Sequence, residues 1–249
     1  MGFWPVVLNV LRNSDIVLLL VDARMPEMTR NSEIIEKVEK MKKRLIIVFN
    51  KTDLVSNKEI KGLKKKYHSA YFISGTKKIG INKLKNDLTN LSENWNSQSL
   101  RLGFVGYPNV GKSTMINLIA PKAKAKVSPV SGTTKKTQWI REGKLRIMDS
   151  PGVIPFGDRK VQLGMTAAKD PHKIKNPEKV ALRIIEFLRK KGTKTLEKFY
   201  KVKEQKTDQD LFNEIGIKMK YLIKGGEVDE NRTAIKIIRD WQSGKISLR

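Results

Sequence analysis

The sequence predicts an α/β fold, a doubly wound and mostly parallel sheet, followed by a small all-helical domain. In the first part of the chain, aliphatic segments that end at polar residues alternate with helical segments, as in the βαβ units of a parallel sheet. After about Phe156 the strand-like segments stop and helical periodicity takes over. We therefore predict an α/β domain over residues 1–160 and a helical domain over residues 161–249.

The predicted strands of the first domain are short runs rich in β-branched and aliphatic residues, and the helices between them are mostly polar or lysine-rich. In chain order the predicted elements are strand 16–22, helix 32–42, strand 44–50, helix 58–67, strand 70–74, helix 81–94, strand 102–105 and helix 113–120. Segments 138–141 and 144–149 flank Glu142-Gly143 and predict a hairpin, which adds one antiparallel edge strand.

The helical domain is predicted from capping residues and apolar faces. Asn176, Pro177 and Glu178 are expected to begin a helix as N-cap, first-turn proline and acidic residue, and Gly192 is expected to end it. Two apolar faces repeat at helical spacing: Val180, Ala181, Ile184, Ile185 and Leu188, then Ala234, Ile237, Ile238 and Trp241. The aromatic residues expected in the core, rather than as platforms for RNA bases, are Phe187, Phe199, Tyr200, Phe212 and Tyr221.

Composition limits the partners and the compartment. The 51 basic and 25 acidic residues give a net charge of +26, which indicates a polyanionic partner such as nucleic acid. The alternative is a lysine-rich solvated surface, as in some thermophile proteins. The absence of cysteine excludes disulfides and thiolate metal sites, and His68 and His172 are isolated. The longest apolar run, residues 16–21, is too short to span a membrane, so we expect a cytoplasmic protein without a membrane partner.

Residues 106–113, Gly-Tyr-Pro-Asn-Val-Gly-Lys-Ser, match the phosphate-binding pattern G-x-x-x-x-G-K-[ST]. In this pattern backbone N–H groups surround the phosphates, the lysine reaches the β- and γ-phosphates, and the hydroxyl binds Mg²⁺. The predicted strand before the loop and the helix after it supply the required context. The nucleotide-binding residues expected in this segment are Asn109, Val110, Gly111, Lys112, Ser113 and Thr114.

A guanine-recognition motif, Asn50-Lys51-Thr52-Asp53, follows the second predicted strand. The Asp53 carboxylate can accept hydrogen bonds from the N1–H and the exocyclic amine of guanine, a donor pair that adenine lacks. The Lys51 stem can cover one face of the base. One strand later, backbone N–H groups at Ser74 and Gly75 are expected to contact the guanine carbonyl. With Asn50, these residues predict GTP and GDP as ligands.

Two motifs after the phosphate-binding loop complete the predicted site. Gly132-Thr133-Thr134 offers a threonine hydroxyl to Mg²⁺ and a backbone group to the γ-phosphate, and we favour Thr134 over Thr133. In Asp149-Ser150-Pro151-Gly152 the aspartate can hold the water shell of Mg²⁺ and the glycine N–H can meet the γ-phosphate. The predicted metal ligands are Ser113, Thr134 and Asp149.

The guanine motif precedes the phosphate-binding loop, the reverse of the usual order. The sequence resembles the circularly permuted GTPases of the YlqF/YawG family over most of its length. The resemblance rests on this motif order and on two segments, residues 22–26 (Asp-Ala-Arg-Met-Pro) and residues 225–229 (Gly-Gly-Glu-Val-Asp). The resemblance implies a circularly permuted P-loop GTPase domain, hydrolysis of GTP to GDP and phosphate, and a role in assembly of the large ribosomal subunit. It also implies that the following domain responds to the nucleotide state.

The expected catalytic residues are Lys112, Thr134, Asn109 and Gly152. Val153 follows the Asp-Ser-Pro-Gly motif where many GTPases have a water-orienting glutamine, so hydrolysis is expected to be slow alone and stimulated by the ribosomal subunit. In resembling GTPases without that glutamine, an asparagine in the phosphate-binding loop helps to bind K⁺. Asn109 occupies this position, and an ordinary loop-geometry role is the equal alternative. The histidine that many bacterial relatives carry near the N-terminus is missing before His68.

Three lysine clusters could bind a polyanion, although each alone is more often a solvated face, and the two between residues 122 and 126 and between residues 190 and 206 are predicted to contact rRNA phosphates. They are Lys58, Lys61, Lys64, Lys65 and Lys66; Lys122, Lys124 and Lys126; and Lys190, Lys191, Lys194, Lys198, Lys201, Lys203 and Lys206. The preferred interpretation is a monomeric GTP-hydrolysing assembly factor that docks on rRNA in the GTP state, without a DNA partner. The alternative is a guanine-nucleotide-gated RNA-binding scaffold with negligible hydrolysis. An RNA-modifying enzyme is poorly supported, because the sequence holds no second catalytic constellation.

Overall fold

The chain forms two compact units. The structure, a computed structural model, describes residues 4–121, 139–154 and 160–249, except for the side chains of residues 160–162. The first unit, called the sheet unit, extends to Gly157 without residues 54–56. The second, called the helical unit, comprises residues 54–56 and the chain from Asp158. Residues 54–56 belong to it because Val55 forms a β-bridge with Leu248.

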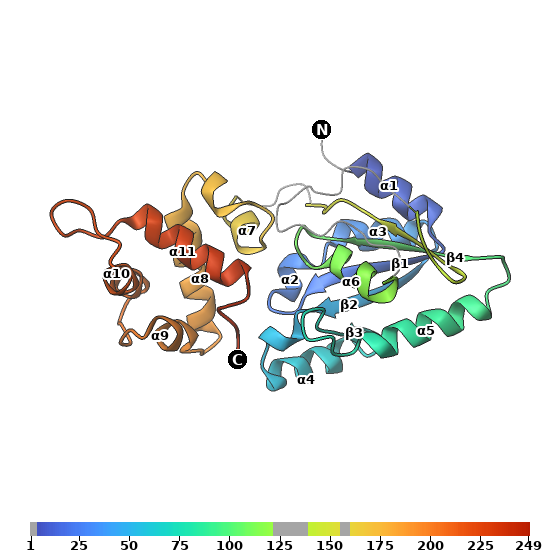
Figure 1. The fold of residues 1–249 in the computed structure, drawn as a ribbon, viewed down its shortest axis with the longest axis horizontal. Helices are drawn as coiled ribbons and strands as arrows, with labels where there is room; N and C mark the ends of the chain where they lie inside the picture. The colour runs from blue at the N-terminus through green and yellow to red at the C-terminus, as the bar shows by residue number, and fades with distance from the viewer. Residues whose placement is uncertain (1–3, 122–138, 155–159) are drawn as a thin grey trace. The chain divides into compact units, whose positions relative to one another are not determined.

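In the sheet unit, strands and helices alternate along the chain (Figure 1). They are α1 (Trp4–Asn13), β1 (Ile16–Asp22), α2 (Pro26–Thr29), α3 (Ser32–Lys40), β2 (Arg44–Asn50), the 3₁₀ turn Thr52–Leu54, α4 (Asn57–Lys66), β3 (Tyr71–Phe72), α5 (Ile81–Glu93), β4 (Leu100–Gly106), α6 (Lys112–Ile119), β5 (Trp139–Glu142) and β6 (Leu145–Asp149).

The described strands form one six-stranded sheet in the order β3-β2-β1-β4-β6-β5. The strands β3, β2, β1, β4 and β6 run parallel, and β5 is antiparallel to β6 at the edge. This confirms the predicted doubly wound, mostly parallel sheet with one antiparallel edge strand. In the register, Asp22 of β1 pairs with Asn50 of β2, and Phe104 of β4 pairs with Asp149 of β6. The polar residues at the carboxyl ends therefore lie along one edge of the sheet.

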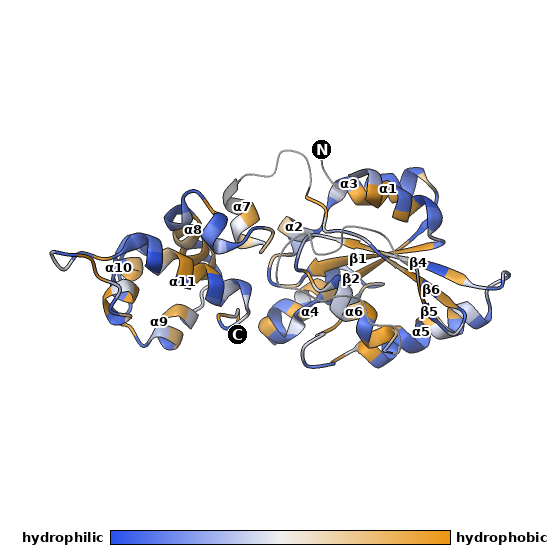
Figure 2. Ribbon diagram, turned by 45° about the horizontal axis from the view of Figure 1, so that its top comes forward, coloured by the Kyte–Doolittle hydropathy of each residue, from blue (hydrophilic) through white to orange (hydrophobic). Residues whose placement is uncertain are grey.

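Helices cover both faces of the sheet, with α1 and α3 on one side and α5 and α6 on the other (Figure 2). All seven residues of β1 are buried, which is why this strand is a continuous apolar run and does not alternate. The hydrophobic core on the α5 and α6 side joins residues from β1, β4 and β6, including Leu18, Phe104 and Ile147. The central strands are thus packed into the core, and the loops at their carboxyl ends are where ligands bind in open α/β sheets.

The helical unit contains α7 (Lys160–Met165), the 3₁₀ turn Pro171–Lys173, α8 (Pro177–Lys190), α9 (Thr195–Tyr200), α10 (Asp208–Lys218) and α11 (Glu230–Gln242). The two predicted apolar faces are buried in full on α8 and α11, which pack against each other. The indole Nε1 of Trp241 donates a hydrogen bond to the Met165 carbonyl oxygen at 3.0 Å, and the Tyr200 hydroxyl donates to Asp240 at 2.9 Å. None of the described helices is long and apolar enough to cross a membrane.

Several predicted details differ from the structure. The third strand is shorter, Tyr71–Phe72, because Ser74 bridges to Ile79 in a turn and no longer extends the sheet. Helix α1 was not predicted, although Val7, Val10 and Leu11 are buried at helical spacing. The expected N-cap Asn176 makes no side-chain capping hydrogen bond, although Pro177 does occupy the first turn of α8. Phe199 is 39% exposed, so the prediction of a core position was wrong there.

Candidate nucleotide-binding site

The phosphate-binding loop connects β4 to α6 and has three residues with positive φ: Gly106 (148°), Asn109 (58°) and Gly111 (102°). A Cβ on Gly106 would lie 2.5 Å from the Leu20 carbonyl oxygen, and one on Gly111 would lie 2.3 Å from Asn50 Nδ2. Both positions therefore need glycine for conformation and for space. Left-handed residues placed between right-handed ones allow backbone N–H groups to turn toward one anion, as the phosphate-binding motif requires.

Lys112 begins α6, and its ammonium group is buried at the loop. Its Nζ donates hydrogen bonds to the carbonyl oxygens of Tyr107 (2.8 Å) and Gly106 (3.2 Å). Burial lowers the pKa of Lys112 to about 8, and the nearby Asp149 carboxylate opposes this shift. A polyphosphate at the loop would supply the negative charge that this desolvated cation lacks.

The hydroxyl of Ser113 and the carboxylate of Asp149 lie together, as predicted for two magnesium ligands. Ser113 Oγ donates to Asp149 Oδ2 at 2.7 Å, and Asp149 is only 6% exposed at the end of β6. An all-oxygen donor set of a hydroxyl and a carboxylate suits Mg²⁺, which prefers oxygen ligands and retains water. These residues therefore fit the metal. The third predicted ligand, Thr134, lies outside the described residues, as do Lys122, Lys124 and Lys126.

Gly152 follows β6 and packs against the phosphate-binding loop. A Cβ at this position would lie 2.5 Å from Pro108 Cα and 2.6 Å from Pro108 N, so no side chain fits without moving the loop backbone. The next residue, Val153, is 2% exposed, and its N–H donates to the Gly106 carbonyl oxygen at 3.1 Å. The segment after Asp149 therefore contacts the phosphate-binding loop directly.

Asn50 connects three loops at the carboxyl edge of the sheet. Its Nδ2 donates to the Val110 carbonyl oxygen at 2.8 Å, and its Oδ1 accepts a hydrogen bond from the Gly75 N–H at 3.0 Å. The side chain is 4% exposed. Thr114 also lies beside this loop, since a Cβ on Gly75 would lie 3.4 Å from its Cγ2. The sequence placed Asn50 in the nucleotide site, but this bridging role depends on contacts between residues 25 and 60 positions apart.

Asp53 is oriented by Ser74. The Ser74 hydroxyl donates to Asp53 Oδ1 at 2.6 Å and accepts from the Lys77 N–H at 3.0 Å. The N–H groups expected to contact the guanine carbonyl have partners inside the protein: that of Ser74 donates to the Ile79 carbonyl oxygen at 3.0 Å, and that of Gly75 donates to Asn50. In this arrangement Ser74 and Gly75 act on the base-recognition residues and do not point free donors outward.

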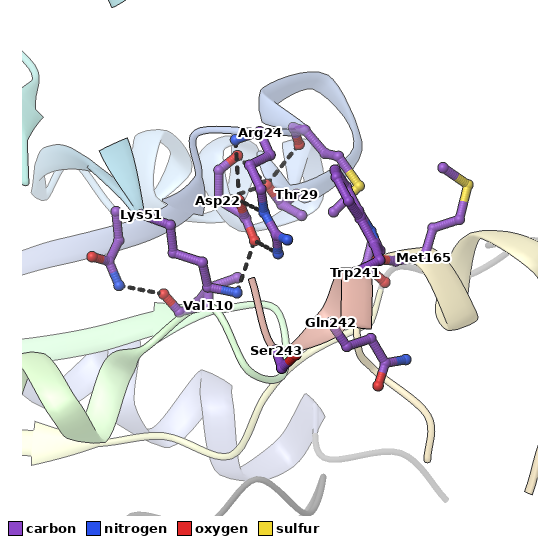
Figure 3. Close-up of polar contacts among 12 residues, drawn as sticks. Asp22, Arg24, Thr29, Lys51, Val110, Met165, Trp241, Gln242 and Ser243 are labelled. Atoms are coloured by element: carbon purple, nitrogen blue, oxygen red, sulfur yellow. Dashed lines mark hydrogen bonds and ion pairs between the residues drawn. The ribbon is translucent and has the colours of Figure 1, made fainter. Parts of the chain in front are cut away.

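Lys51 has φ of 63° and directs its ammonium group to Asp22, with Nζ 2.9 Å from Oδ2 (Figure 3). Asp22, at the end of β1, is also bound by Arg24, whose side-chain nitrogens lie 3.0 and 2.8 Å from the two carboxylate oxygens. In the sequence, Asp22 and Arg24 are recognisable only as part of the motif at residues 22–26. Their proximity to Lys51 was foreseeable from the parallel pairing of β1 and β2, because adjacent parallel strands bring their carboxyl ends together.

Comparisons with known proteins agree with this geometry. The family model described as the elongation factor Tu GTP binding domain matches residues 2–138, more than half of the chain, and the model described as 50S ribosome-binding GTPase matches residues 101–214. The GNP-bound YlqF from T. maritima has the same fold, with a TM-score of 0.67 and 22% identity over 98% of this chain and 95% of that chain.

The chain is also similar to longer proteins. An uncharacterized GTP-binding protein of Methanocaldococcus jannaschii is 36% identical over 97% of this chain and 65% of its own length. Nuclear/nucleolar GTPase 2 of Arabidopsis thaliana is 34% identical over 98% and 43%, and nucleolar GTP-binding protein 2 of Saccharomyces cerevisiae is 32% identical over 98% and 52%. The chain therefore spans between 43% and 65% of the length of these relatives. It belongs to the P-loop GTPases that share the elongation factor Tu GTP binding domain, and its fold is that of the circularly permuted GTPase YlqF.

Proposed function

We propose that this chain binds GTP with Mg²⁺, hydrolyses it to GDP and phosphate, and acts in assembly of the large ribosomal subunit by docking on rRNA in the GTP state. The observation that supports this most directly is the Asn50 bridge, which joins the base-recognition loop, the Gly75 loop and the phosphate-binding loop at one edge of the sheet. A single nucleotide can contact all three only if they are held together in this way.

In this proposal the residues have separate tasks. Asp53 selects guanine and Lys51 covers one face of the base. The loop from Asn109 to Thr114 surrounds the phosphates, with Lys112 supplying positive charge at the β/γ bridge. Ser113, Thr134 and Asp149 hold Mg²⁺, which supplies further positive charge at the phosphate oxygens when it is bound. The Gly152 N–H meets the γ-phosphate.

The chain offers no water-orienting side chain next to Gly152, because Val153 is apolar, buried and hydrogen-bonded through its N–H to Gly106. We therefore propose that hydrolysis is slow in the isolated chain and is stimulated by the ribosomal subunit. K⁺ bound with the help of Asn109 is the alternative source of positive charge.

The proposed ribosomal partner rests on charge and on relatives. The net charge of +26 suits a polyanion, and counterion release gives such binding a steep dependence on salt. One matching family model is described as a 50S ribosome-binding GTPase, and the plant and yeast relatives are named for the nucleolus. We propose that the chain acts as a monomer in the compartment where large subunits are assembled, the cytoplasm in a cell without a nucleus.

Single-turnover hydrolysis of labelled GTP, with and without purified large subunits, tests this function. The expected result is a slow rate alone and a clear acceleration with subunits, both abolished in Lys112→Ala. A chain that binds GTP and pellets with subunits but never hydrolyses would favour the scaffold alternative. Equal affinity for GTP and ATP would contradict the assignment altogether.

A further inference from the structure

A buried ion cluster joins the base-recognition residue Lys51 to two residues, Asp22 and Arg24, that have no task in the function proposed above. It consists of Asp22, Arg24 and Lys51 (Figure 3). Asp22 Oδ1 accepts hydrogen bonds from the Arg24 N–H and Nε, both at 3.0 Å. Asp22 Oδ2 accepts from an Arg24 terminal nitrogen at 2.8 Å and from Lys51 Nζ at 2.9 Å. One carboxylate thus holds two cations.

The two cationic side chains differ in exposure and in the number of contacts that they make with Asp22. The Arg24 side chain is 0% exposed and grips the carboxylate at both oxygens, whereas the Lys51 side chain is 19% exposed. Burial alone would raise the pKa of Asp22, but Arg24 and Lys51 outweigh it and hold that pKa well below its ordinary value. The Asp22 backbone N–H donates to Thr29 Oγ1 at 3.0 Å. Arg24 and Thr29 therefore fix the position of a permanently charged acceptor for Lys51.

The backbone of Lys51 is fixed as well. Its φ of 63° lies in the left-handed region, which is uncommon for a residue other than glycine. Asn50, before it, is bound to Val110 and Gly75, and the Thr52 N–H after it donates to the Ile73 carbonyl oxygen at 3.1 Å. The four-carbon stem of Lys51 is therefore held at both ends, at the backbone and at the ammonium group.

We infer that Asp22 is a positioning residue for the guanine nucleotide: by holding the Lys51 ammonium, it sets the stem of Lys51 in the place where it covers the base. This inference rests on the proposed nucleotide binding and goes beyond it. A side chain that is already ordered loses little conformational entropy when the base binds. Asp22 therefore contributes to nucleotide affinity without touching the ligand. Discrimination by the edge of the base remains with Asp53, which has its own support in Ser74.

The test is GDP and IDP affinity of the full chain, measured by titration calorimetry. Asp22→Asn is expected to weaken GDP binding about ten-fold through the loss of ordering at Lys51. The ratio of GDP to IDP affinity should stay the same, because inosine lacks only the exocyclic amine that Asp53 recognises. Unaltered GDP affinity, or a loss of the GDP preference, would overturn the inference.

A double-mutant cycle separates positioning from general damage. Lys51→Met keeps the stem but removes the ammonium, and it is expected to weaken GDP binding by a similar factor. Adding Asp22→Asn to it should then have no further effect on affinity, because Asp22 acts through Lys51. Additive losses would contradict this. If Asp22→Asn does not fold, Lys51→Met still tests the inference, because position 51 is partly exposed. Unaltered GDP affinity in Lys51→Met would overturn the inference.

A second buried carboxylate provides the matched control. Asp240 in the helical unit is 1% exposed and is bound by Lys236 and the Tyr200 hydroxyl. Asp240→Asn is expected to lower thermal stability without changing GDP affinity. A ten-fold loss of GDP affinity in Asp240→Asn would mean that the effect of Asp22→Asn comes from lower stability and not from positioning. Failure of the unaltered chain to bind GDP would instead refute the proposed function, and would do so before any variant is compared.

Discussion

At the scale of single residues, the site is built from polar side chains that act on one another. Asn50 joins its own loop to those of Gly75 and Val110, Ser74 orients Asp53, and Asp22 holds Lys51. Each contact is made by a side chain at 0–4% exposure, where a hydrogen bond to a charged or amide group is worth more than at the surface. Substitutions at these residues should therefore change nucleotide affinity in specific ways.

Asp53→Asn is expected to weaken GTP binding by about 2–4 kcal/mol, because one oxygen acceptor becomes a donor that faces the donors of guanine. Xanthine has a carbonyl in place of the exocyclic amine, so the asparagine variant should bind XTP better than the unaltered chain does. Titrations with GTP, XTP and ATP measure both effects. Asp210→Asn, an exposed aspartate on α10, is the control and should bind GTP normally. A variant that loses GTP without gaining XTP would argue for misfolding of the loop.

Asn109 combines a left-handed backbone, φ of 58°, with the position proposed for K⁺ binding. Asparagine tolerates this conformation better than alanine does, and glycine tolerates it best. If the amide helps to bind K⁺, replacing Na⁺ by K⁺ should accelerate hydrolysis, and both Asn109→Gly and Asn109→Ala should abolish the acceleration. If only loop geometry matters, Asn109→Gly should hydrolyse GTP normally in both salts while Asn109→Ala is impaired. Single-turnover rates at constant ionic strength distinguish the two.

Asp22 should also affect the pH dependence of stability. Its folded-state pKa lies below the ordinary value of 3.8, so its contribution to the free energy of unfolding is present above that pH and is lost as the pH falls toward the folded-state pKa. The difference in unfolding free energy between the unaltered chain and Asp22→Asn should be constant between about pH 5 and 8 and should shrink below about pH 4. Urea unfolding followed by circular dichroism measures it. A difference that grows on acidification would contradict the assigned direction.

At the scale of elements, strand ends and helix starts determine where the chemistry lies. The parallel strands β1, β2, β4 and β6 end in Asp22, Asn50, Gly106 and Asp149, and their pairing brings these residues to one edge. Helix starts in the helical unit differ in their caps. Asp229 accepts a hydrogen bond from the Arg232 N–H at 2.9 Å at the start of α11, whereas Asn176 makes no such side-chain bond at the start of α8.

These two caps give a matched pair. Asp229→Ala is expected to destabilise the helical unit by about 1 kcal/mol, the usual cost of losing an N-cap hydrogen bond. Asn176→Ala should cost clearly less, because no such bond is lost and Pro177 already fixes the first turn of α8. Urea unfolding of the two variants measures the difference. Equal losses would mean that Asn176 stabilises the helix start in another way.

At the scale of the whole molecule, positive charge extends through both units while each unit has a core of its own. Not every lysine in the tail cluster is equally available to an anion. All five lysines compared here are exposed, but Lys190 is paired with Glu186 at 2.6 Å and Lys194 with Glu204 at 2.5 Å, whereas Lys198, Lys203 and Lys206 have no ion pair among the described residues. A phosphate has to compete with a carboxylate for the first two, so the other three are the better candidates for rRNA contacts.

Reversing Lys198, Lys203 and Lys206 to Glu should weaken pelleting with large subunits and flatten the log–log salt dependence by about one unit per lost phosphate contact. GTP affinity should not change. Reversing Lys190 and Lys194 is the matched comparison and should flatten the salt dependence less, because their charges are already partly neutralised. A KCl series in a pelleting assay decides. If the salt slope of the first variant is unaltered, the RNA contact lies elsewhere in the chain.

Sequence patterns alone were enough to predict the fold class, which the structure confirms, and the motifs of the proposed nucleotide site. Their evidence was local: the apolar runs of residues 16–22 and 44–50 match β1 and β2 in full, and the loop at residues 106–113 has a pattern whose geometry follows from its glycines and lysine. The faces of α8 and α11 were likewise visible as apolar periodicity. Such features depend on neighbours within a few positions, which sequence patterns record directly.

The partners that the site residues take depend on the tertiary fold. Asn50 could be assigned to the nucleotide site, but its bonds to Val110 and Gly75 require β2, β3 and β4 to be placed in one sheet. The short β3, the engaged N–H groups of Ser74 and Gly75, and the pairing of Lys51 with Asp22 are of the same kind. A buried polar group must find a partner wherever the fold brings one within reach, and that distance in space has no fixed relation to separation along the chain.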